Sequence, residues 1–385
     1  MPRSKSPAML AIGVGLALTL VGCSSASTSS ETSEAAASVA ASSAPAESAA
    51  AASGAPTDAA TVLSTENIQS VIDAYPGEIT ALPTSFGEAT PGALKIGWSE
   101  ARDANELNNR LSVAIEKEVA KMGGTLTKLD ANGDPGAQVG QIQQLVNEGV
   151  DAIIVWPLDA TALQPSIKAA KDAGIPVVAM EVTPDGSQEI GDIAGQVIYG
   201  RDQQAYVAAN LMAQLFPGAQ VATNKFAVPV PSINYYAERA AFWATDAGLE
   251  VVATVDNPSD DVTGGESMAG PILSKYPDLK GWLAYNDASA MGVTAASKAA
   301  GMDVTAFGQN GEDAALEAIK AGNLALTLEP PVVDWARQLV AGAYLAKAGT
   351  EIPKSVYVGP GTYVSAANVD SAQTLTDIIN GAYAG

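Results

Sequence analysis

Residues 131–184 decide the fold: ANGDPGAQVGQIQQLVNEGVDAIIVWPLDATALQPSIKAAKDAGIPVVAMEVTP. Asp134 is a preferred helix N-cap, and Pro135 follows at the first helical position. Apolar residues then recur at helical spacing until Gly149, where the pattern stops. This part of the sequence therefore predicts one amphipathic helix over residues 135–149.

Two buried strands and a second helix follow in the same stretch. Residues 152–156 are apolar without alternation, as expected for a parallel strand that is covered on both faces. Asp159 starts the next helix, and residues 176–180 form a second strand of the same kind. Alternating helices and strands predict right-handed crossovers and a doubly wound sheet. Ligands bind beyond the carboxyl ends of strands in such sheets, so Trp156, Asp159 and Glu181 lie at the expected binding edge.

The same alternation extends through most of the remaining chain. The first strand is expected near residues 94–98, and the pattern restarts with a helix at 202–216 after a break at 191–200. A length of 385 residues with 47% hydrophobic content is enough for about two domains with separate cores. We therefore predict an α/β fold of two lobes, each built on a doubly wound parallel sheet.

The composition excludes several classes of function. The formal net charge is -22, so nucleic acid and anionic membrane surfaces would be repelled. Histidine is absent and cysteine occurs once, which excludes Ser-His-Asp and Cys-His catalysis, imidazole or thiolate zinc sites and an intrachain disulfide. No phosphate-binding or dinucleotide glycine motif follows a predicted strand. We expect no cofactor and no metal.

The N-terminal segment predicts export. Residues 1–23 combine a basic start with an apolar run of signal-peptide length, and they end in L-V-G-C, which resembles the lipobox of bacterial lipoproteins. The resemblance implies cleavage before Cys23 and its lipidation; the alternative is an ordinary secretory signal with an incidental cysteine. Residues 24–60 are almost wholly small and polar, so we expect a disordered tether. Residues 61–92 form an N-terminal extension without an evident function.

The order of several short motifs resembles the periplasmic sugar-binding protein family, of the ribose-binding type that serves ABC transporters. The likeness covers about residues 93–370. The motifs are DAIIVWPLDA at 151–160, AGIPVV at 173–178, AERA at 237–240, LAYNDASAMG at 283–292 and EAIKAGNLALT at 317–327.

The resemblance implies a type I periplasmic binding protein, whose two lobes are joined by a three-strand hinge and close on a ligand. It suggests a first lobe at 93–197 plus 330–356 and a second at 198–329 plus 357–385.

The resemblance also implies a set of ligand-binding residues at strand ends and near the crossovers. Their amide, carboxylate and guanidinium groups suit sugar hydroxyls, which both donate and accept hydrogen bonds. The residues are Arg102, Asn105, Asn108, Trp156, Glu181, Arg239, Asn286, Asn310 and Glu329. An aromatic face could cover the apolar side of a pyranose, a role open to Trp98, Trp156, Tyr235 or Trp335.

Some of these positions have a simpler structural interpretation. Arg239 could pair with a neighbouring acid on a solvated helix face, and Trp243 is expected in the core. Asn286 and Asp287 are both helix-capping residue types. We expect Asp287 to cap the helix and Asn286 to face the cleft. Where the family commonly has two aromatics after the first strand, this chain has Leu107 and Asn108, so the sugar's identity is not carried over.

The leading hypothesis is a monomeric, lipid-anchored receptor outside the cytoplasm that captures a small polar solute, expected to be a sugar, for an ABC transporter permease. The alternatives are a non-sugar ligand such as a nucleoside or amino-acid derivative, or service to a sensor. A glycosidase would need a pair of carboxylates that the sequence does not single out. A transcription regulator of the same fold would need an N-terminal DNA-binding helix pair, where this chain has a signal and a tether.

Overall fold

The computed structural model describes residues 58–77, 81–187 and 190–384. The predicted signal peptide, Cys23 and nearly all of the predicted tether lie outside the described residues. No helix in the described ranges has both the length and the apolar character that crossing a membrane requires.

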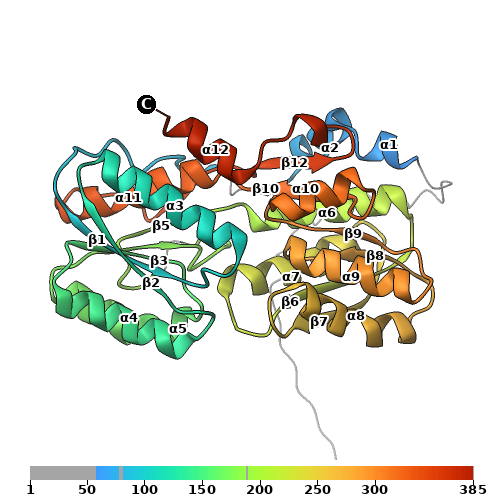
Figure 1. Cartoon of the computed structure of the whole chain (residues 1–385), viewed down its shortest axis with the longest axis horizontal. Helices are drawn as coiled ribbons and strands as arrows, with labels where there is room; N and C mark the ends of the chain where they lie inside the picture. Colours follow the sequence, from blue (N-terminus) through green and yellow to red (C-terminus); the bar gives the residue numbers. More distant parts are fainter. Residues whose placement is uncertain (1–57, 78–80, 188–189, 385) are drawn as a thin grey trace, which may run out of the picture. The chain divides into compact units, whose positions relative to one another are not determined.

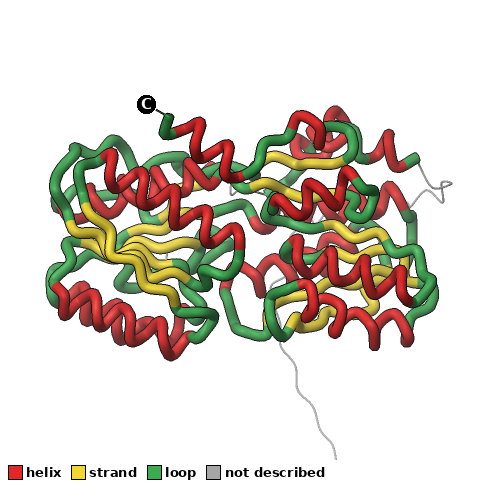
Figure 2. Tube along the Cα trace, viewed as in Figure 1, coloured by secondary structure: helices red, strands yellow, loops and turns green. Residues whose placement is uncertain are grey.

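The first lobe is built on a six-stranded sheet. Its strands are β1 (Lys95–Glu100), β2 (Thr125–Asp130), β3 (Ala152–Val155), β4 (Val177–Met180), β5 (Gly195–Ile198) and β11 (Ser355–Tyr357). They are ordered β11-β5-β4-β3-β1-β2, and every neighbouring pair is parallel. Helices flank the sheet (Figures 1 and 2): α3 (Glu106–Lys121), α4 (Pro135–Glu148), α5 (Ala160–Asp172) and α11 (Val332–Lys347).

The second lobe repeats this plan. Its strands are β6 (Gln220–Phe226), β7 (Glu250–Asn257), β8 (Leu279–Leu283), β9 (Thr305–Phe307), β10 (Leu326–Glu329) and β12 (Thr362–Ser365). The order is β12-β10-β9-β8-β6-β7, with all pairs parallel except β10 with β12. Its helices are α6 (Arg201–Leu215), α7 (Pro231–Asp246), α8 (Val262–Lys275), α9 (Asp287–Ala299), α10 (Asp313–Lys320) and the 3-10 turn η2 (Val369–Ser371).

The prediction of two parallel-sheet α/β lobes is confirmed, and the local signals in residues 131–184 act as expected. The Asp134 carboxylate accepts hydrogen bonds from the backbone N–H groups of Gly136 and Ala137 at the start of α4. Gly149 ends that helix in the left-handed conformation, with φ of 65°. All four residues of β3 and of β4 are buried.

Two strands, β2 and β5, were not among the sequence expectations. In β2 the sequence TLTKLD alternates weakly, and the strand is only partly buried because it lies at the sheet edge. The four residues of β5 are buried but include Gly195 and Gln196, which interrupt the apolar pattern. Both strands take their place from neighbouring strands rather than from a strong signal of their own.

The chain passes between the lobes more often than the predicted hinge requires. It crosses between β5 and α6, between β10 and α11, and between β11 and β12. The C-terminal helix α12 (Leu375–Ala382) then packs on α3 and α11 of the first lobe. The prediction that residues 357–385 belong wholly to the second lobe is therefore wrong for this helix. The amphipathic α12 buries Leu375 and Ile379, which supplies the physical reason for its return.

The N-terminal extension is folded onto this body. It contains α1 (Ala59–Val62) and α2 (Thr65–Asp73), and both helices contact α6. Ser64, rather than the expected Thr65, caps α2 by accepting a hydrogen bond from the Asn67 backbone N–H.

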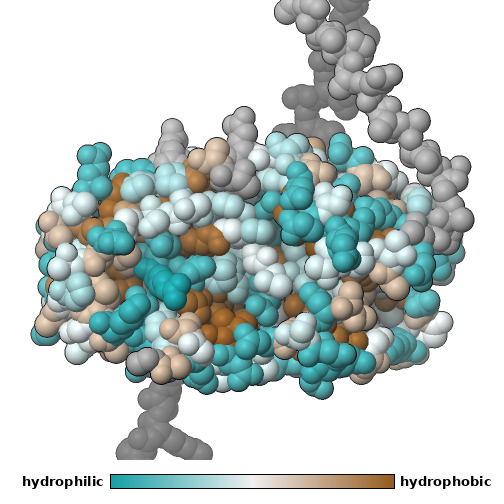
Figure 3. Space-filling view, turned by 90° about the horizontal axis from the view of Figure 1, so that it is seen from above, coloured by the Kyte–Doolittle hydropathy of each residue, from teal (hydrophilic) through white to brown (hydrophobic). Residues whose placement is uncertain are grey.

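Each lobe has an apolar core on its sheet faces, and the surface is largely polar. Trp98 and Trp282 are fully buried in the two lobes. Figure 3 shows one face of the protein, where hydrophilic side chains surround small apolar patches. Within the described ranges Phe242 and Val262 are the large apolar side chains that are exposed. A polar, acidic surface of this kind favours solubility.

Close packing of α8 on α9 gives a test of the fold. A Cβ atom at Gly292 would lie 2.3 Å from the Val262 carbonyl oxygen and 2.7 Å from the Glu266 backbone nitrogen. These backbone atoms cannot move aside, so Gly292→Ala should lower the free energy of unfolding by about 1–3 kcal/mol. Gly270→Ala is the matched control, because nothing lies within 4 Å of its Cβ position. This control should stabilise the protein by about 0.5–1 kcal/mol. Urea unfolding of both variants measures the difference, and equal stabilities would contradict the packing.

Candidate functional site

A small cavity lies between the two lobes, where the carboxyl ends of both sheets meet. It offers about 50 Å³ of space to water centres, enough for a few water molecules. Nearly all of its lining follows the end of a strand, from β1, β3, β6, β7, β8 and β9. The lining residues are Ala101, Arg102, Asn105, Leu107, Asn108, Trp156, Leu158, Arg201, Phe226, Val230, Ile233, Asp260, Tyr285, Asn286 and Asn310.

Six of the nine predicted ligand-binding residues line this cavity. They are Arg102, Asn105, Asn108, Trp156, Asn286 and Asn310. Asn105 also caps α3, since its side-chain oxygen accepts a hydrogen bond of 3.3 Å from the Asn108 backbone N–H. The polar loop after β1 is thus held in place by the helix that it starts. Contact of these six residues with a ligand stays a prediction.

Asp260 is a cavity residue that the sequence did not single out. It follows β7, and its backbone has φ of 54°, in the left-handed region. One carboxylate oxygen accepts hydrogen bonds from the Tyr285 hydroxyl at 2.7 Å and from the Asn286 side-chain amide at 2.8 Å. Burial raises the pKa of Asp260, and the Tyr285 hydrogen bond and the Arg102 charge oppose this rise. The second lobe therefore presents a largely buried, hydrogen-bonded carboxyl to the cavity, with a side chain that is 10% exposed.

Arg102 joins the two lobes at the cavity wall. It lies in the loop after β1, and its Nη1 donates to the Ser259 carbonyl oxygen of the second lobe at 2.5 Å. The same atom lies 3.8 Å from an Asp260 carboxylate oxygen. Among the described residues the buried Arg102 Nε has no hydrogen-bond partner. The guanidinium thus links the lobes and retains a donor at the cavity.

Glu181 does not line the cavity, and its role is different from the predicted one. It is fully buried and pairs with Arg201 through Arg201 Nε at 3.2 Å and Arg201 Nη2 at 3.2 Å. Burial raises the pKa of Glu181, and the Arg201 charge opposes the rise. Arg201 itself lines the cavity and donates to Gln309 Oε1 of the second lobe at 3.4 Å. Glu181 therefore acts by orienting Arg201, a residue that the sequence analysis missed.

Trp156 is the only one of the four proposed stacking aromatics that lines the cavity. Within the described part of the chain its buried indole Nε1 has no hydrogen-bond partner. Trp335 is fully buried and packs edge-on against Trp156, with ring centroids 5.9 Å apart. Trp98 is also buried, and its indole N–H donates to Ser112. Tyr235 lines a different pocket, near Tyr75 and Asp202. Phe226 and Tyr285 supply further aromatic surface that was not predicted.

Asn286 performs both roles that we had divided between it and Asp287. Its side-chain oxygen caps α9 by accepting from the Ser289 backbone N–H at 2.9 Å, while its amide nitrogen donates to Asp260. Asp287 is instead buried beneath the site, where it accepts from the Thr327 hydroxyl at 2.6 Å and the Glu312 backbone N–H at 3.0 Å. The prediction that Asp287 caps the helix is therefore wrong.

Asn310 is held by a buried acid. Its backbone has φ of 116°, and its amide nitrogen donates to Glu312 Oε1 at 3.1 Å. Glu181 and Asp260 also have positive φ, at 44° and 54°. Non-glycine residues seldom adopt this conformation, and such strain concentrates at functional sites. Three of the four described non-glycine residues with positive φ thus belong to the cavity or its immediate support.

Arg239 does not reach the cavity, which corrects its predicted role. It pairs with Asp202 of α6, and its guanidinium lies over the Phe242 ring, 4.1 Å from the centroid. Ile233, near the start of α7, does line the cavity. Arg239 is six residues further on, about 9 Å along the helix, and faces another direction. Trp243, which we expected in the core, packs against the core but is only partly buried, and its indole N–H donates to Asp202.

Glu329 is also outside the cavity. It ends β10 opposite Thr362 of the antiparallel edge strand and lines a separate surface pocket with Asn368 and Gln373. Burial raises the pKa of Glu329 to about 7. Its position at a strand end is as predicted, but the edge strand β12 places its side chain in a different pocket.

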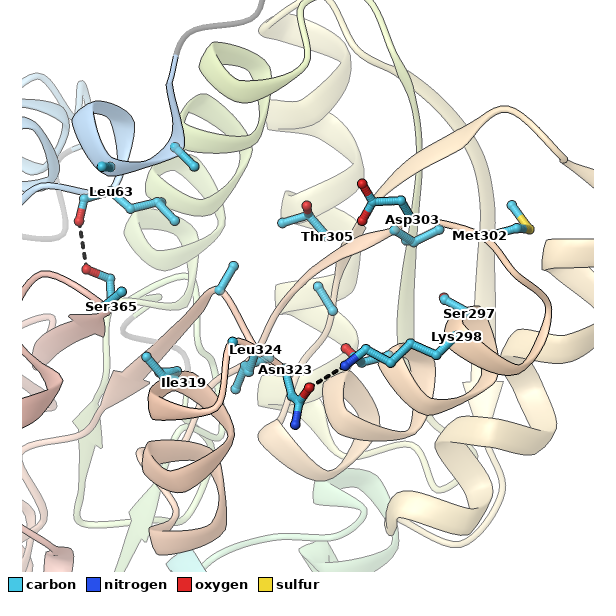
Figure 4. A pocket seen from close by; sticks show the side chains of 18 of the residues that line it. Leu63, Ser297, Lys298, Met302, Asp303, Thr305, Ile319, Asn323, Leu324 and Ser365 are labelled. Carbon is cyan, nitrogen blue, oxygen red and sulfur yellow. Dashed lines mark hydrogen bonds between the residues drawn. The ribbon is translucent and has the colours of Figure 1, made fainter.

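A larger cavity, of about 450 Å³, lies at the opposite edge of the second sheet (Figure 4). Val304 and Leu324, which line it, precede β9 and β10, so it faces the amino ends of these strands. Lys298 on its rim bonds to Asn323. The lining is mostly small and apolar, without the convergent charged groups of the cavity between the lobes. We therefore assign the ligand site to the smaller cavity, which has the buried hydrogen-bonding groups.

The described residues contain no group of three or more histidine, cysteine, aspartate or glutamate side chains placed to hold a metal ion.

The two cavity residues that the sequence analysis missed, Arg201 and Asp260, had weak sequence signals. Arg201 directly follows the break at 191–200, and Asp260 lies in an acid-rich loop after a predicted strand. The position of each after a strand was the available signal.

The comparisons with known proteins agree on one family. A family model described as "Periplasmic binding protein domain" matches residues 96–351. The chain is 31% identical over 236 residues to the ribose import binding protein of Bacillus subtilis, covering 60% of this chain and 75% of that protein. It is 27% identical over 258 residues to the xylitol-binding protein of Mycolicibacterium smegmatis, covering 63% of this chain and 69% of that protein.

Solved structures are similar over about three quarters of the chain. An ABC transporter solute binding protein of Bacillus halodurans with bound myo-inositol gives a TM-score of 0.65 at 25% identity, covering 74% of this chain and 98% of that chain. One from Mycobacterium smegmatis with bound glycerol gives 0.65 at 25% identity, covering 74% and 99%.

The buried carboxyls of Glu312 and Asp287, beneath the site, should make the stability of the protein depend on pH. Burial raises the pKa of Glu312 to about 7 and holds the pKa of Asp287 well above its usual range. A carboxyl with a raised pKa binds more protons in the folded state than in the unfolded state. The free energy of unfolding should therefore fall as the pH rises from about 4.5 to about 7. At about 1.4 kcal/mol per pKa unit, the loss due to Glu312 is at most roughly 3 kcal/mol.

Urea unfolding across this range should show the decline in the wild type and a clearly smaller decline in Glu312→Gln. Glu317→Gln on α10 is the matched control, because that side chain is exposed. It should leave the slope unchanged. An unchanged slope in Glu312→Gln would contradict the assignment.

Proposed function

Because the chain belongs to the periplasmic binding protein family, as a ribose-type sugar-binding member, we propose that it is the extracytoplasmic substrate-binding protein of an ABC importer for a small polyhydroxylated solute. A monosaccharide or a cyclic or linear polyol is the favoured class. The observation that carries this proposal is the cavity between the lobes, where buried donors and acceptors from both lobes converge.

The chemistry of the cavity suits hydroxyl groups. Arg102 and Arg201 supply donors, Asp260 supplies acceptors, and the asparagine side chains supply both. A hydroxyl donates one hydrogen bond and accepts others, so it can satisfy both kinds of partner at once. Trp156 offers an unpaired N–H among the described residues together with an aromatic face. These features support a sugar or polyol over an apolar ligand.

The size of the cavity limits the ligand. About 50 Å³ of space for water centres accommodates a few waters, which the hydroxyls of one small molecule would displace. An oligosaccharide would require the lobes to stay apart. The same argument disfavours a nucleoside, whose base adds a second ring.

The lobe contacts indicate how capture would work. Arg102 of the first lobe bridges to Ser259 of the second, and the Asp313 backbone N–H of the second lobe donates to Glu106 Oε1 of the first at 3.3 Å. Opening the lobes would break these contacts and admit solvent. A ligand that contacts both lobes would favour the closed state by its greater affinity for that state.

We propose in addition a lipid anchor and a transport partner for this protein. Lipidation at Cys23 would anchor the protein on the outer side of the cell membrane, and residues 24–60 would hold the folded body away from the lipid. The partner would be an ABC transporter permease, and the protein would act as a monomer without catalysis. Globomycin-sensitive processing together with loss of membrane association in Cys23→Ser would support the anchor, and a fully soluble wild type would contradict it.

Calorimetric titration tests the ligand class with D-ribose, D-allose, xylitol, myo-inositol and glycerol. At least one should bind and raise the melting temperature. Arg102→Met should weaken that binding about 10- to 100-fold, since a charged hydrogen bond contributes roughly 1.5–3 kcal/mol. Arg239→Met is the matched control and should change the affinity less than about twofold, because its guanidinium lies outside the cavity. Equal losses in both variants, or no binding across the panel, would contradict the proposal.

A further inference from the structure

The N-terminal extension is attached to both lobes beside the hinge. We call its described parts, residues 58–77 and 81–87, the hinge strap. This segment precedes the region that the family model matches, which begins at residue 96. None of it lines the cavity between the lobes. It therefore makes no direct contribution to the lining of the proposed ligand site.

The first part of the strap is fixed to the second lobe. Val62, Leu63, Ile68 and Val71 are buried, and both α1 and α2 contact α6. The Ser365 hydroxyl of β12 donates to the Leu63 carbonyl oxygen at 2.7 Å, as Figure 4 shows. These contacts bury an apolar helix face and satisfy a free carbonyl at the turn between α1 and α2.

Polar contacts extend this attachment along α6. The Asn67 side-chain amide donates to Gln214 Oε1 at 2.9 Å. The Tyr206 hydroxyl donates to the Ala74 carbonyl oxygen at 3.2 Å. The Tyr75 hydroxyl donates to the Asp202 carboxylate at 2.7 Å, and the Tyr75 and Tyr206 rings pack edge to face. The strap is thus bonded along the length of α6.

The second part of the strap is fixed to the first lobe. The Tyr357 backbone N–H of β11 donates to the Pro83 carbonyl oxygen at 2.8 Å. Phe86 is buried, and its backbone N–H donates to Gln338 Oε1 of α11 at 2.9 Å. A Cβ atom at Gly195 or Gly342 would lie within 2.9 Å of the Phe86 ring. The first lobe therefore holds this ring in a space that only glycine at both positions leaves open.

The two attachments lie on either side of the hinge. Asp202 is the second residue of α6, directly after the crossover from β5 to α6. Tyr357 is the last residue of β11, directly before the crossover from β11 to β12. Seven residues lie between Tyr75 and Pro83, so the eight steps of chain that connect them span at most about 28 Å. Any motion that bends the crossovers also changes the separation of these two attachments. The strap is consequently a further covalent link between the lobes, with its own packing on each lobe.

We propose that the hinge strap restrains the motion of the lobes, narrowing the range of open states that the ligand-free protein samples. A flexible hinge of three strands permits both bending and twisting. A further link, fixed by burial at both ends, opposes the twisting motion and reduces the entropy of the open ensemble. The binding-competent state then has a larger population, and the apparent affinity rises by the same factor.

Electron spin resonance distances in the ligand-free protein test this restraint. Spin labels go on Gln143→Cys of α4 and Glu266→Cys of α8, both at exposed positions, in the Cys23→Ser background. Inserting Gly-Ser-Gly-Ser after Gly77 lengthens the strap while leaving every described attachment in place. The insertion should broaden the distance distribution between the lobes and shift it to longer values.

The same insertion after Gly218 is the matched control. Gly218 lies in an exposed turn of the second lobe with nothing within 4 Å of its Cβ position, so the distribution should stay that of the wild type. If the insertion after Gly77 also leaves it unchanged, the restraint is overturned. If that variant fails to fold, Tyr75→Phe decides: it removes only the hydroxyl bonded to Asp202 and should broaden the distribution to a smaller extent. No change there would equally overturn the proposal. Because the measurement needs no ligand, it is independent of the proposed function.

Discussion

The parallel direction of the strands is the constraint on which this structure depends. Each strand from β1 to β10 that belongs to a βαβ unit ends at the same edge of its sheet, so the residues after successive strands are gathered there. Two such edges face one another across the cavity. Arg102, Trp156, Asp260 and Asn286 are far apart in the sequence, and they come together because each directly follows a strand.

Burying carboxyl groups at this edge of the sheets costs desolvation free energy, which hydrogen bonds and an ion pair in the site offset. Glu181 is paired with Arg201, and Asp260 accepts from Tyr285 and Asn286. Buried carboxyls without such partners would be expensive to desolvate. The left-handed backbone at Glu181, Asp260 and Asn310 shows that the chain also accepts local strain to aim these groups. Rigid support beneath a polar cavity favours recognition of a defined pattern of hydroxyls.

Elements outside the two sheets join the lobes in addition to the hinge. The extension packs on α6 and then on α11, and the C-terminal α12 returns to α3 and α11. The first described helices therefore pack on the second lobe, although the strand that follows them, β1, belongs to the first. The last helix, α12, packs on the first lobe, although the strand that precedes it, β12, belongs to the second. This arrangement makes the two lobes interdependent in stability, because each buries apolar residues supplied by a segment anchored on the other.

Much of the fold was determined by the sequence alone, because its signals are local. The caps at Asp134 and Gly149 and the apolar strands at 152–156 and 176–180 need no distant partner to be recognised. Of the six predicted residues that line the cavity, Trp156 could be placed at the sheet edge because it follows a buried parallel strand, and the others came from the resemblance to the family. Weakly alternating edge strands such as β2 lack this signal.

The tertiary structure decided which charged side chains complete the site. Arg239 was a predicted binding residue and Arg201 was not, but helix phase and the Asp202 pairing turn Arg239 away, while Glu181 holds Arg201 against the cavity. Glu329 lies outside the site because the antiparallel edge strand β12, which comes later in the chain, pairs with β10 beside it. These outcomes depend on contacts between residues distant in sequence. Periodicity and capping report on neighbours within a few residues, so they carry no information about such pairings.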